Sequence, residues 1–306
     1  MEKKPANNKW LVRLIFLLVV IIIVIFIFIW TGTIRCRSIP GACEVYWGVM
    51  TIVTGRNQPS VLILHDPTDD EGLGNPELLK QLLSDKKGIA IHPTIADIRY
   101  LNPEQLKNVS LVIVEKAKKI STIQLLTFQN YASQGGRIVW IGDAGTVPYE
   151  GDNLFYQEGS VDSNNPWVRV TDENIIIYFN KFLGVNYVTN FCNVRNCTKD
   201  VYSGKLVVSD THPLTYGIRS GLQIYDDYSI VKKTEPNPTP LMIEYGANLF
   251  DETDKTKNYG KVFEGIVTSN SNLIAYYAIP PEYLAEDDDE EKYYSFVWNM
   301  FDGMVR

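Results

Sequence analysis

Acidic side chains and one histidine follow several apolar runs that have the length and composition of buried strands. The clearest run is Gly135–Gly145, GGRIVWIGDAG, where a glycine pair ends a predicted helix and Asp143 follows an apolar stretch at a glycine-flanked turn. The candidate ligand-binding residues of this kind are His65, Asp66, Asp69, Asp70, Glu115 and Asp143. Open α/β folds place their ligand crevice at the carboxyl ends of the strands, so these side chains would line one crevice if their strands are neighbours.

Carboxylates that share a mouth could perform two kinds of chemistry. Their oxygens could bind a divalent cation, or an acid and a base could together hydrolyse a glycan. The alternative, which we favour, is structural: Asp143 and the acidic loop 66–71 would accept hydrogen bonds from backbone N–H groups in turns. We therefore predict no catalytic residue, no resident metal ion and no cofactor.

The elements that would position these residues alternate along the chain. The predicted strands are 60–65, 88–95, 110–115 and 137–141, and the helices between them begin at Pro76, at the segment 102–108 and at Ser121. Such alternation implies right-handed crossovers and a mainly parallel sheet sandwiched by helices, an α/β fold. A loop from Thr146 to Val170 and a capped helix from Thr171 to Leu183 would follow, and then strands that extend the sheet or pack on it.

Several short phrases carry a family resemblance when they are taken in order. They are SLVIVE, QNYASQGGRIVWIGDAG, a helix ending in FLGV, DTHPLTYGI, and NLIAYYAIPPEYL before a terminal helix with FVWNMF. Between about Ser60 and Arg306 this pattern resembles the class I glutamine amidotransferase-like superfamily, and more closely its non-catalytic, membrane-anchored extracellular relatives. The resemblance implies a flavodoxin-like α/β domain.

The nucleophile of that family is missing from this sequence. Active members carry G-x-C-x-G at the turn after the matched strand, and superposing its last glycine on Gly145 places Asp143 at the cysteine and Ile141 at the first glycine. A carboxylate cannot replace the thiolate that attacks the amide of glutamine. The family's H-x-E pair is also absent, since Glu282 in PPEY has no histidine beside it. The sequence leaves the question of an enzyme open and favours a protein that is not one.

The N-terminal region predicts a membrane anchor. The run from Leu14 to Trp30 contains no polar residue, and about 20 such residues span a bilayer core. Basic residues precede this run, which favours a cytoplasmic N-terminus. We predict a cytoplasmic tail (1–13), a transmembrane helix (14–34), a juxtamembrane segment (35–56) and an exoplasmic amidotransferase-like domain (57–306), in a single-pass protein of the cell membrane. The alternative is a cleaved signal peptide, but the apolar run is longer than usual and no A-x-A-like site follows it.

The cysteines and the sequons fit an exoplasmic domain. Four cysteines form two local pairs, Cys36 with Cys43 and Cys192 with Cys197, which suggests two small-loop disulfides, although four cysteines allow three connectivities. A four-cysteine zinc site is the competing interpretation, with a spacing looser than usual. Two N-x-S/T sequons make Asn108 and Asn196 candidate glycosylation sites.

Charge and composition limit the partners. Twenty-nine basic against thirty-six acidic residues give a net charge of −7, and no basic stripe follows the N-terminus, so nucleic acid is not an expected partner. The expected partners are the lipid bilayer, through residues 14–34, and a protein or glycan of the cell envelope. Our first hypothesis is a catalytically silent domain that binds an envelope ligand or protein partner. The alternatives are a membrane-anchored hydrolase of envelope glycan or peptide, and a structural subunit of a membrane complex.

Overall fold

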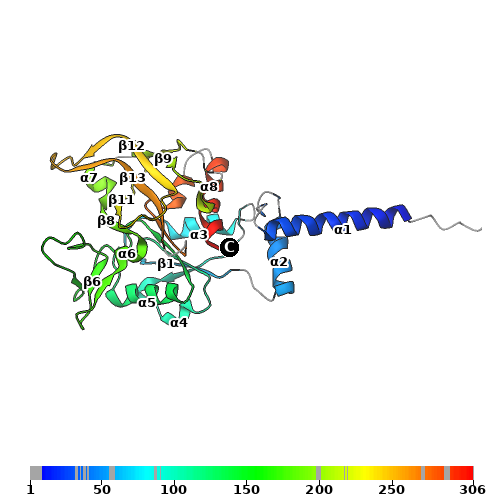
Figure 1. Ribbon diagram of the computed structural model, residues 1–306, viewed down its shortest axis with the longest axis horizontal. Helices are drawn as coiled ribbons and strands as arrows, with labels where there is room; N and C mark the ends of the chain where they lie inside the picture. The colour runs from blue at the N-terminus through cyan, green and yellow to red at the C-terminus, as the bar shows by residue number, and fades with distance from the viewer. Residues whose placement is uncertain are drawn as a thin grey trace, which may run out of the picture. The chain divides into compact units, whose positions relative to one another are not determined.

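A computed structural model describes most of the chain, in two compact units, Met1–Gln58 and Pro59–Arg306 (Figure 1). The described residues are 9–31, 34, 36, 39, 41–54, 59–85, 88–89, 91–197, 201–216, 218, 220–269, 273–285 and 290–305, with backbone alone at 30, 54 and 290–296. Residues 1–8 of the predicted cytoplasmic tail lie outside this set, as do parts of the predicted juxtamembrane segment.

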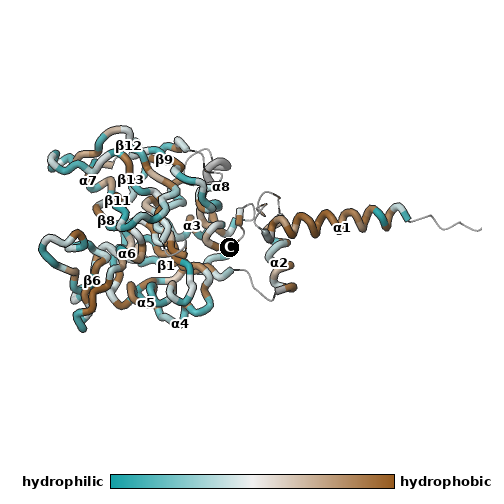
Figure 2. Tube along the Cα trace, viewed as in Figure 1, coloured by the Kyte–Doolittle hydropathy of each residue, from teal (hydrophilic) through white to brown (hydrophobic). Residues whose placement is uncertain are grey.

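The first unit consists of two apolar helices, α1 (Lys9–Trp30) and α2 (Ala42–Thr54). Among the described helices α1 alone is long and apolar enough to cross a membrane, and Figure 2 shows its continuous hydrophobic surface. Its 22 residues extend about 33 Å, which matches the hydrocarbon core of a bilayer. Such a helix can serve as a membrane anchor or as a signal sequence. Helix α2 is a finding that the sequence did not predict.

One half of the main sheet is parallel. Among the described residues it contains, in spatial order, β2 (Thr94–Asp97), β1 (Val61–His65), β3 (Leu111–Val114), β4 (Arg137–Ile141) and β14 (Ile274–Tyr277). The side chains of β3 and nearly all of those of β4 are buried, as expected for strands that are covered on both faces. The sequence prediction of a strand at 88–95 was displaced, because β2 begins only after Pro93, which has no N–H to donate.

The other half of the sheet is antiparallel. Beyond β14 it continues with β13 (Asn258–Ser269), β12 (Leu241–Phe250), β9 (Gly204–Val208) and β10 (Gln223–Ile224). In this sheet β13 and β9 run against the common direction, so most described strands still point the same way. The C-terminal strands therefore extend the sheet, one of the two arrangements that the sequence allowed.

Helices cover both faces of the sheet. Helix α3 (Pro76–Ser84) packs against α8 (Glu290–Val305), where the indole N–H of Trp298 donates to the Leu82 carbonyl oxygen at 2.8 Å. Helix α5 (Thr122–Ser133) packs against α4 (Pro103–Leu106) and α6 (Phe179–Leu183). The short helices are η2 (Ile98–Tyr100), η3 (Pro213–Thr215), η4 (Pro281–Ala285) and α7 (Phe191–Val194). The architecture is the α/β sandwich that the sequence predicted.

Two smaller sheets flank the main one. Strands β8 (Val185–Asn190) and β11 (Ser229–Lys233) form a pair, and β5 (Asn153–Leu154), β6 (Val168–Val170) and β7 (Ile176–Tyr178) form a three-stranded sheet. The predicted helix from Thr171 to Leu183 is wrong in its first half. Three consecutive isoleucines, whose β-branched side chains suit a strand, pair with β6 there, and only α6 is helical.

Both local cysteine pairs form disulfides, Cys36 with Cys43 and Cys192 with Cys197. Each closes a short loop, with Cα atoms 4.8 Å and 5.2 Å apart. The predicted disulfides are therefore confirmed. Since all four sulfurs are used, the competing zinc site has no thiolate ligands.

Candidate functional site

The carboxyl ends of β1, β3 and β4 meet at one edge of the sheet. The three strands are neighbours in register, with Leu64 opposite Val114 and Val114 opposite Trp140. The topology thus brings His65, Glu115 and Asp143 to the same edge, as expected for parallel strands. What these side chains do there depends on their burial and their partners.

Asp143 is completely buried in a tight turn between Gly142 and Gly145, both of which have positive φ angles. Its Oδ1 accepts the backbone N–H of Leu73 at 2.9 Å, and its Oδ2 accepts the side-chain amide of Asn190 at 2.8 Å. The Lys118 ammonium lies 3.4 Å from the same Oδ2. The carboxylate therefore joins the loop after β1 to the end of β8.

The acids after β1 are used mainly within their own loop. Asp66, which is buried, accepts both the N–H and the hydroxyl of Thr68. Asp69 accepts the Gly72 N–H at 2.8 Å through Oδ1 and the Lys118 N–H at 2.6 Å through Oδ2. Asp70 is exposed. This loop therefore has the turn structure that aspartates commonly support.

Glu115 forms a buried carboxyl pair with Glu282 of η4. Both residues are completely buried, and burial together with the Glu282 carboxyl raises the pKa of Glu115 well above its ordinary value. Glu282 Oε1 also accepts the Asn75 N–H at 2.6 Å, and a Cβ added to Gly74 would lie 2.9 Å from Glu115 Oε2. The pair holds the loop before α3 against the strand ends, and two carboxyl groups this close retain a proton between them.

His65 lies at the same edge but apart from these networks. It is partly buried, and burial lowers its pKa against the opposing influence of Asp97. Asp143 and the carboxyl pair take their hydrogen bonds from the loop after β1 and from β8 instead. The edge therefore brings the predicted residues near one another without joining all of them into one constellation.

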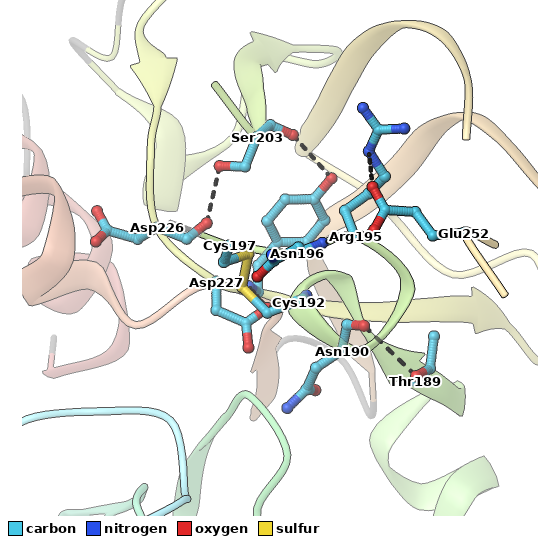
Figure 3. Close-up of a disulfide and its surroundings, with 11 residues drawn as sticks. Thr189, Asn190, Cys192, Arg195, Asn196, Cys197, Ser203, Asp226, Asp227 and Glu252 are labelled. Atoms are coloured by element: carbon cyan, nitrogen blue, oxygen red, sulfur yellow. Dashed lines mark hydrogen bonds and ion pairs between the residues drawn. A yellow bond between two sulfur atoms is a disulfide. The ribbon is translucent and has the colours of Figure 1, made fainter. Parts of the chain in front are cut away.

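Several residues at this edge were missed by the sequence analysis. Asn190 and Lys118 contact Asp143, and Asp227 lies beside α7, which the second disulfide closes (Figure 3). Asp227 Oδ1 accepts the N–H groups of Cys192 and Tyr228 at 2.9 and 2.8 Å. Burial raises the pKa of Asp227 to about 6, with a smaller contribution from Asp143. The position of Asn190 just before FCNVRNC was the available signal.

A metal site has no support at this edge. Within the part of the chain that the structure describes, no group of three or more histidine, cysteine, aspartate or glutamate side chains is arranged to hold an ion. Most of the carboxylate oxygens already accept hydrogen bonds from the protein. The arrangement is a polar core with one carboxyl group, that of Asp227, near the surface.

A groove of about 610 Å³ lies elsewhere on the domain, over the sheet of β5, β6 and β7. Its floor includes the cross-strand row Asn153, Val170 and Ile176. Exposed apolar side chains on this sheet and its loops are Leu154, Tyr156, Val161, Ile175 and Ile176, which we call the apolar patch. An exposed apolar cluster of this kind marks interaction sites more often than isolated surface residues do.

The candidate glycosylation sites are both exposed. Asn108 lies in the turn after α4, and Asn196 lies beside the Cys192–Cys197 disulfide. Thr198 of the second sequon lies outside the described residues. Modification of either asparagine stays a prediction.

No known family model and no curated protein sequence matches this chain. Solved structures that match include a β-galactosidase from Bacillus circulans sp. alkalophilus, at a TM-score of 0.51 and 13% identity, over 83% of this chain and 32% of that one. A putative ThuA-like protein from Bacteroides uniformis matches at 0.49 and 14%, over 77% and 95%. A putative GMP synthase protein from Thermoplasma acidophilum matches at 0.46 and 9%, over 82% and 94%.

These likenesses concern the fold alone. Only the β-galactosidase match among these three exceeds a TM-score of 0.5, and its 13% identity shows a shared fold without a shared activity. The chain spans about a third of the length of the β-galactosidases that it matches. The α/β architecture is therefore shared with known proteins, and function has to be argued from the residues.

Proposed function

We propose that this is a single-pass membrane protein whose Pro59–Arg306 domain faces the cell envelope and binds a partner there without catalysing a reaction. The observation that carries this proposal is the state of Asp143. It occupies the place of the nucleophile in the amidotransferase-like turn, yet it is completely buried and both of its oxygens are engaged. A side chain in that state supports the fold and has no access to a substrate.

Membrane attachment is supported by the first unit and by the oxidised cysteines. Helix α1 is apolar over a bilayer's thickness, and the basic residues before it favour a cytoplasmic N-terminus. Disulfides persist in oxidising compartments, so the pair in the second unit supports a domain outside the cytoplasm.

Binding is supported by the groove and the apolar patch. Asp172 lines the groove, and Glu158 and Glu173 are exposed on the adjoining loops. The arginine of this sheet, Arg169, is buried and donates to the Gly145 carbonyl oxygen at 3.0 Å. The exposed surface is therefore apolar with acidic surroundings, which suits a protein partner that presents apolar and basic side chains.

A second candidate, a membrane-anchored hydrolase, is favoured by one observation. The pKa of Asp227, raised to about 6 by burial, would let this carboxyl group exchange a proton near neutral pH, as a general acid must. Asp227 is also part of the environment of Lys118 and Asp143. We rank this function second, because Asp143 cannot serve as its partner while it is buried.

Two measurements on the full-length protein in membranes distinguish these functions. Wild type and the Asp227→Asn variant would be assayed for release of products from envelope glycans, peptides and glutamine. We expect no turnover from either protein; turnover that is lost in the variant would favour the hydrolase.

The binding function is tested by photo-crosslinking in intact membranes. A p-benzoylphenylalanine would replace Ile176 in the groove or, as the control, Ile123, which is exposed on α5. We expect a discrete protein adduct from position 176 and none from position 123. Equal labelling at both positions would contradict a specific binding surface at the groove.

A further inference from the structure

Helix α2 is apolar on most of its surface. Its sequence, ACEVYWGVMTIVT, contains one charged residue, Glu44, in the first turn. Val45, Ile52 and Val53 are 62%, 86% and 72% exposed. Val45 and Ile52 are seven residues apart and so lie on one side of the helix, with Gly48 and Val49 between them. Leaving large apolar side chains in water forgoes the free energy that their burial would contribute, so this face calls for an apolar environment.

The opposite face of α2 packs on the end of α1. The Cys36–Cys43 disulfide closes the turn between the two helices, and both cysteines are buried. The rings of Phe26 and Tyr46 lie 5.5 Å apart, centre to centre, and Ile29 is buried. Phe26 is about one helical turn before the end of α1. Tyr46 is therefore at the level of the last turns of the candidate membrane span.

This position limits the surroundings of α2. If α1 crosses a bilayer, its last turn lies where the hydrocarbon core meets the head groups, and the first turns of α2 lie at the same depth. Thirteen residues extend about 20 Å, too short to cross the core. An apolar helix of this length at that depth fits an element that lies in the interface.

The polar groups of α2 fit the same location. The Thr51 hydroxyl donates to the Trp47 carbonyl oxygen at 2.9 Å, so it is satisfied within the helix without water. Tyr46 and Trp47 pack edge to face, 5.1 Å between ring centres. Tyrosine and tryptophan are enriched at membrane interfaces because their rings are apolar and their tips are polar. Glu44 in the first turn is placed where the helix dipole favours a negative charge.

We propose that α2 is a second membrane-contacting element, which lies in the lipid interface with Val45, Ile52 and Val53 among the acyl chains. The inference rests on the proposed membrane anchoring by α1, and it adds a helix outside the predicted span 14–34. The occupant of the exposed face is lipid, because this face continues the lipid-facing surface of α1 through a disulfide-closed turn. A second copy of the chain, or the chain's own α/β domain, would be a protein occupant of the same face.

Photo-crosslinking of the full-length protein in phosphatidylcholine vesicles tests this inference. A p-benzoylphenylalanine would replace Ile52 on α2, Ile22 at the middle of α1, or Ile123 on α5, which are 86%, 54% and 75% exposed. After irradiation, the digested peptides would be examined by mass spectrometry for lipid adducts. We expect adducts at positions 22 and 52 in comparable yield and none at position 123.

The controls separate the two proposals. An adduct at position 22 together with a protein cross-link and no lipid at position 52 would overturn the role of α2 and leave the anchor intact. An absence of lipid at both positions would overturn the anchor itself. Because all three positions are exposed, none of the replacements requires the core to change.

Discussion

The strand-end edge and the three-stranded sheet of β5–β7 invert the usual distribution of polar and apolar side chains. At the edge, Glu115, Asp143 and Glu282 are completely buried. On the small sheet, Ile175, Ile176 and the rest of the apolar patch are exposed. Buried polar groups and exposed apolar groups are the two departures from the normal pattern that carry information.

The contrast separates structure from binding. At the edge, Asp143 and Glu282 accept hydrogen bonds from groups that belong to other segments of the chain, so their removal should loosen the domain. The apolar patch contributes little to the core, so its removal should leave stability unchanged and affect only association. Substitutions in the two regions should therefore have opposite signatures.

The largest effect is expected from Asp143→Ala. This change leaves the Leu73 N–H, the Asn190 amide and the Lys118 ammonium without their common acceptor, and breaking a buried charged network costs about 3–5 kcal/mol. Chemical denaturation of the purified full-length protein would measure the loss. The control is Asp70→Ala at an exposed position of the same edge, which should change the free energy of unfolding by no more than about 0.5 kcal/mol. Equal effects of the two variants would remove the distinction.

A smaller loss is expected when both Cys192 and Cys197 are replaced by serine. The disulfide closes a short loop, with a sequence separation of 5, and chain entropy predicts about 2 kcal/mol for such a loop. The loss should be accompanied by faster hydrogen exchange in α7, whose Cys192 N–H donates to Asp227. Protection of that amide that does not change would show that the disulfide is not needed to hold α7 at the edge.

The carboxyl pair predicts a pH dependence. The pKa of Glu115 is raised above its ordinary value of 4.5, so the folded domain retains a proton that the unfolded chain releases. Its contribution to stability is present in full below about pH 4.5 and is lost as the pH rises through the raised pKa. Glu115→Gln should reduce this fall in the free energy of unfolding, measured as a series of denaturation curves against pH. Glu77→Gln on the exposed side of α3 should keep the wild-type slope.

The smallest effect on stability is expected from Ile176→Ser in the groove. The residue is exposed, so the free energy of unfolding should stay within about 0.5 kcal/mol of wild type. The same variant should lose the protein cross-link that forms from the groove, with the photoreactive group placed at Tyr156 for this purpose. A retained cross-link at normal stability would move the binding surface away from the groove.

The features that the sequence predicted depend on local signals. Ser121 and Gln124 form the expected capping box, with both hydrogen bonds present at 3.2 and 2.8 Å. The cysteines pair across short loops, and the apolar runs around Val112 and Val139 became the central strands.

The features that it missed depend on contacts between distant residues. Asn190 reaches Asp143 across 47 positions, and Glu282 meets Asn75 across 207. No local pattern marks either pair, so the sequence could name the carboxylates at the edge but could not show that they are buried. Helix α2 and the strand within Thr171–Leu183 were missed because pairing and packing outweighed the turn and capping patterns in those segments.

The position of β14 has a consequence for how the domain is made. This strand lies between β4 and β13 and is the only link between the two halves of the described main sheet. During synthesis and export, β4 therefore remains an open edge until Ile274 and the residues after it have emerged. Pairing between segments so far apart is slow, and an unpaired apolar edge invites association with other chains. The nascent domain should consequently depend on chaperones over most of its length, and its folding should finish in one late, cooperative step.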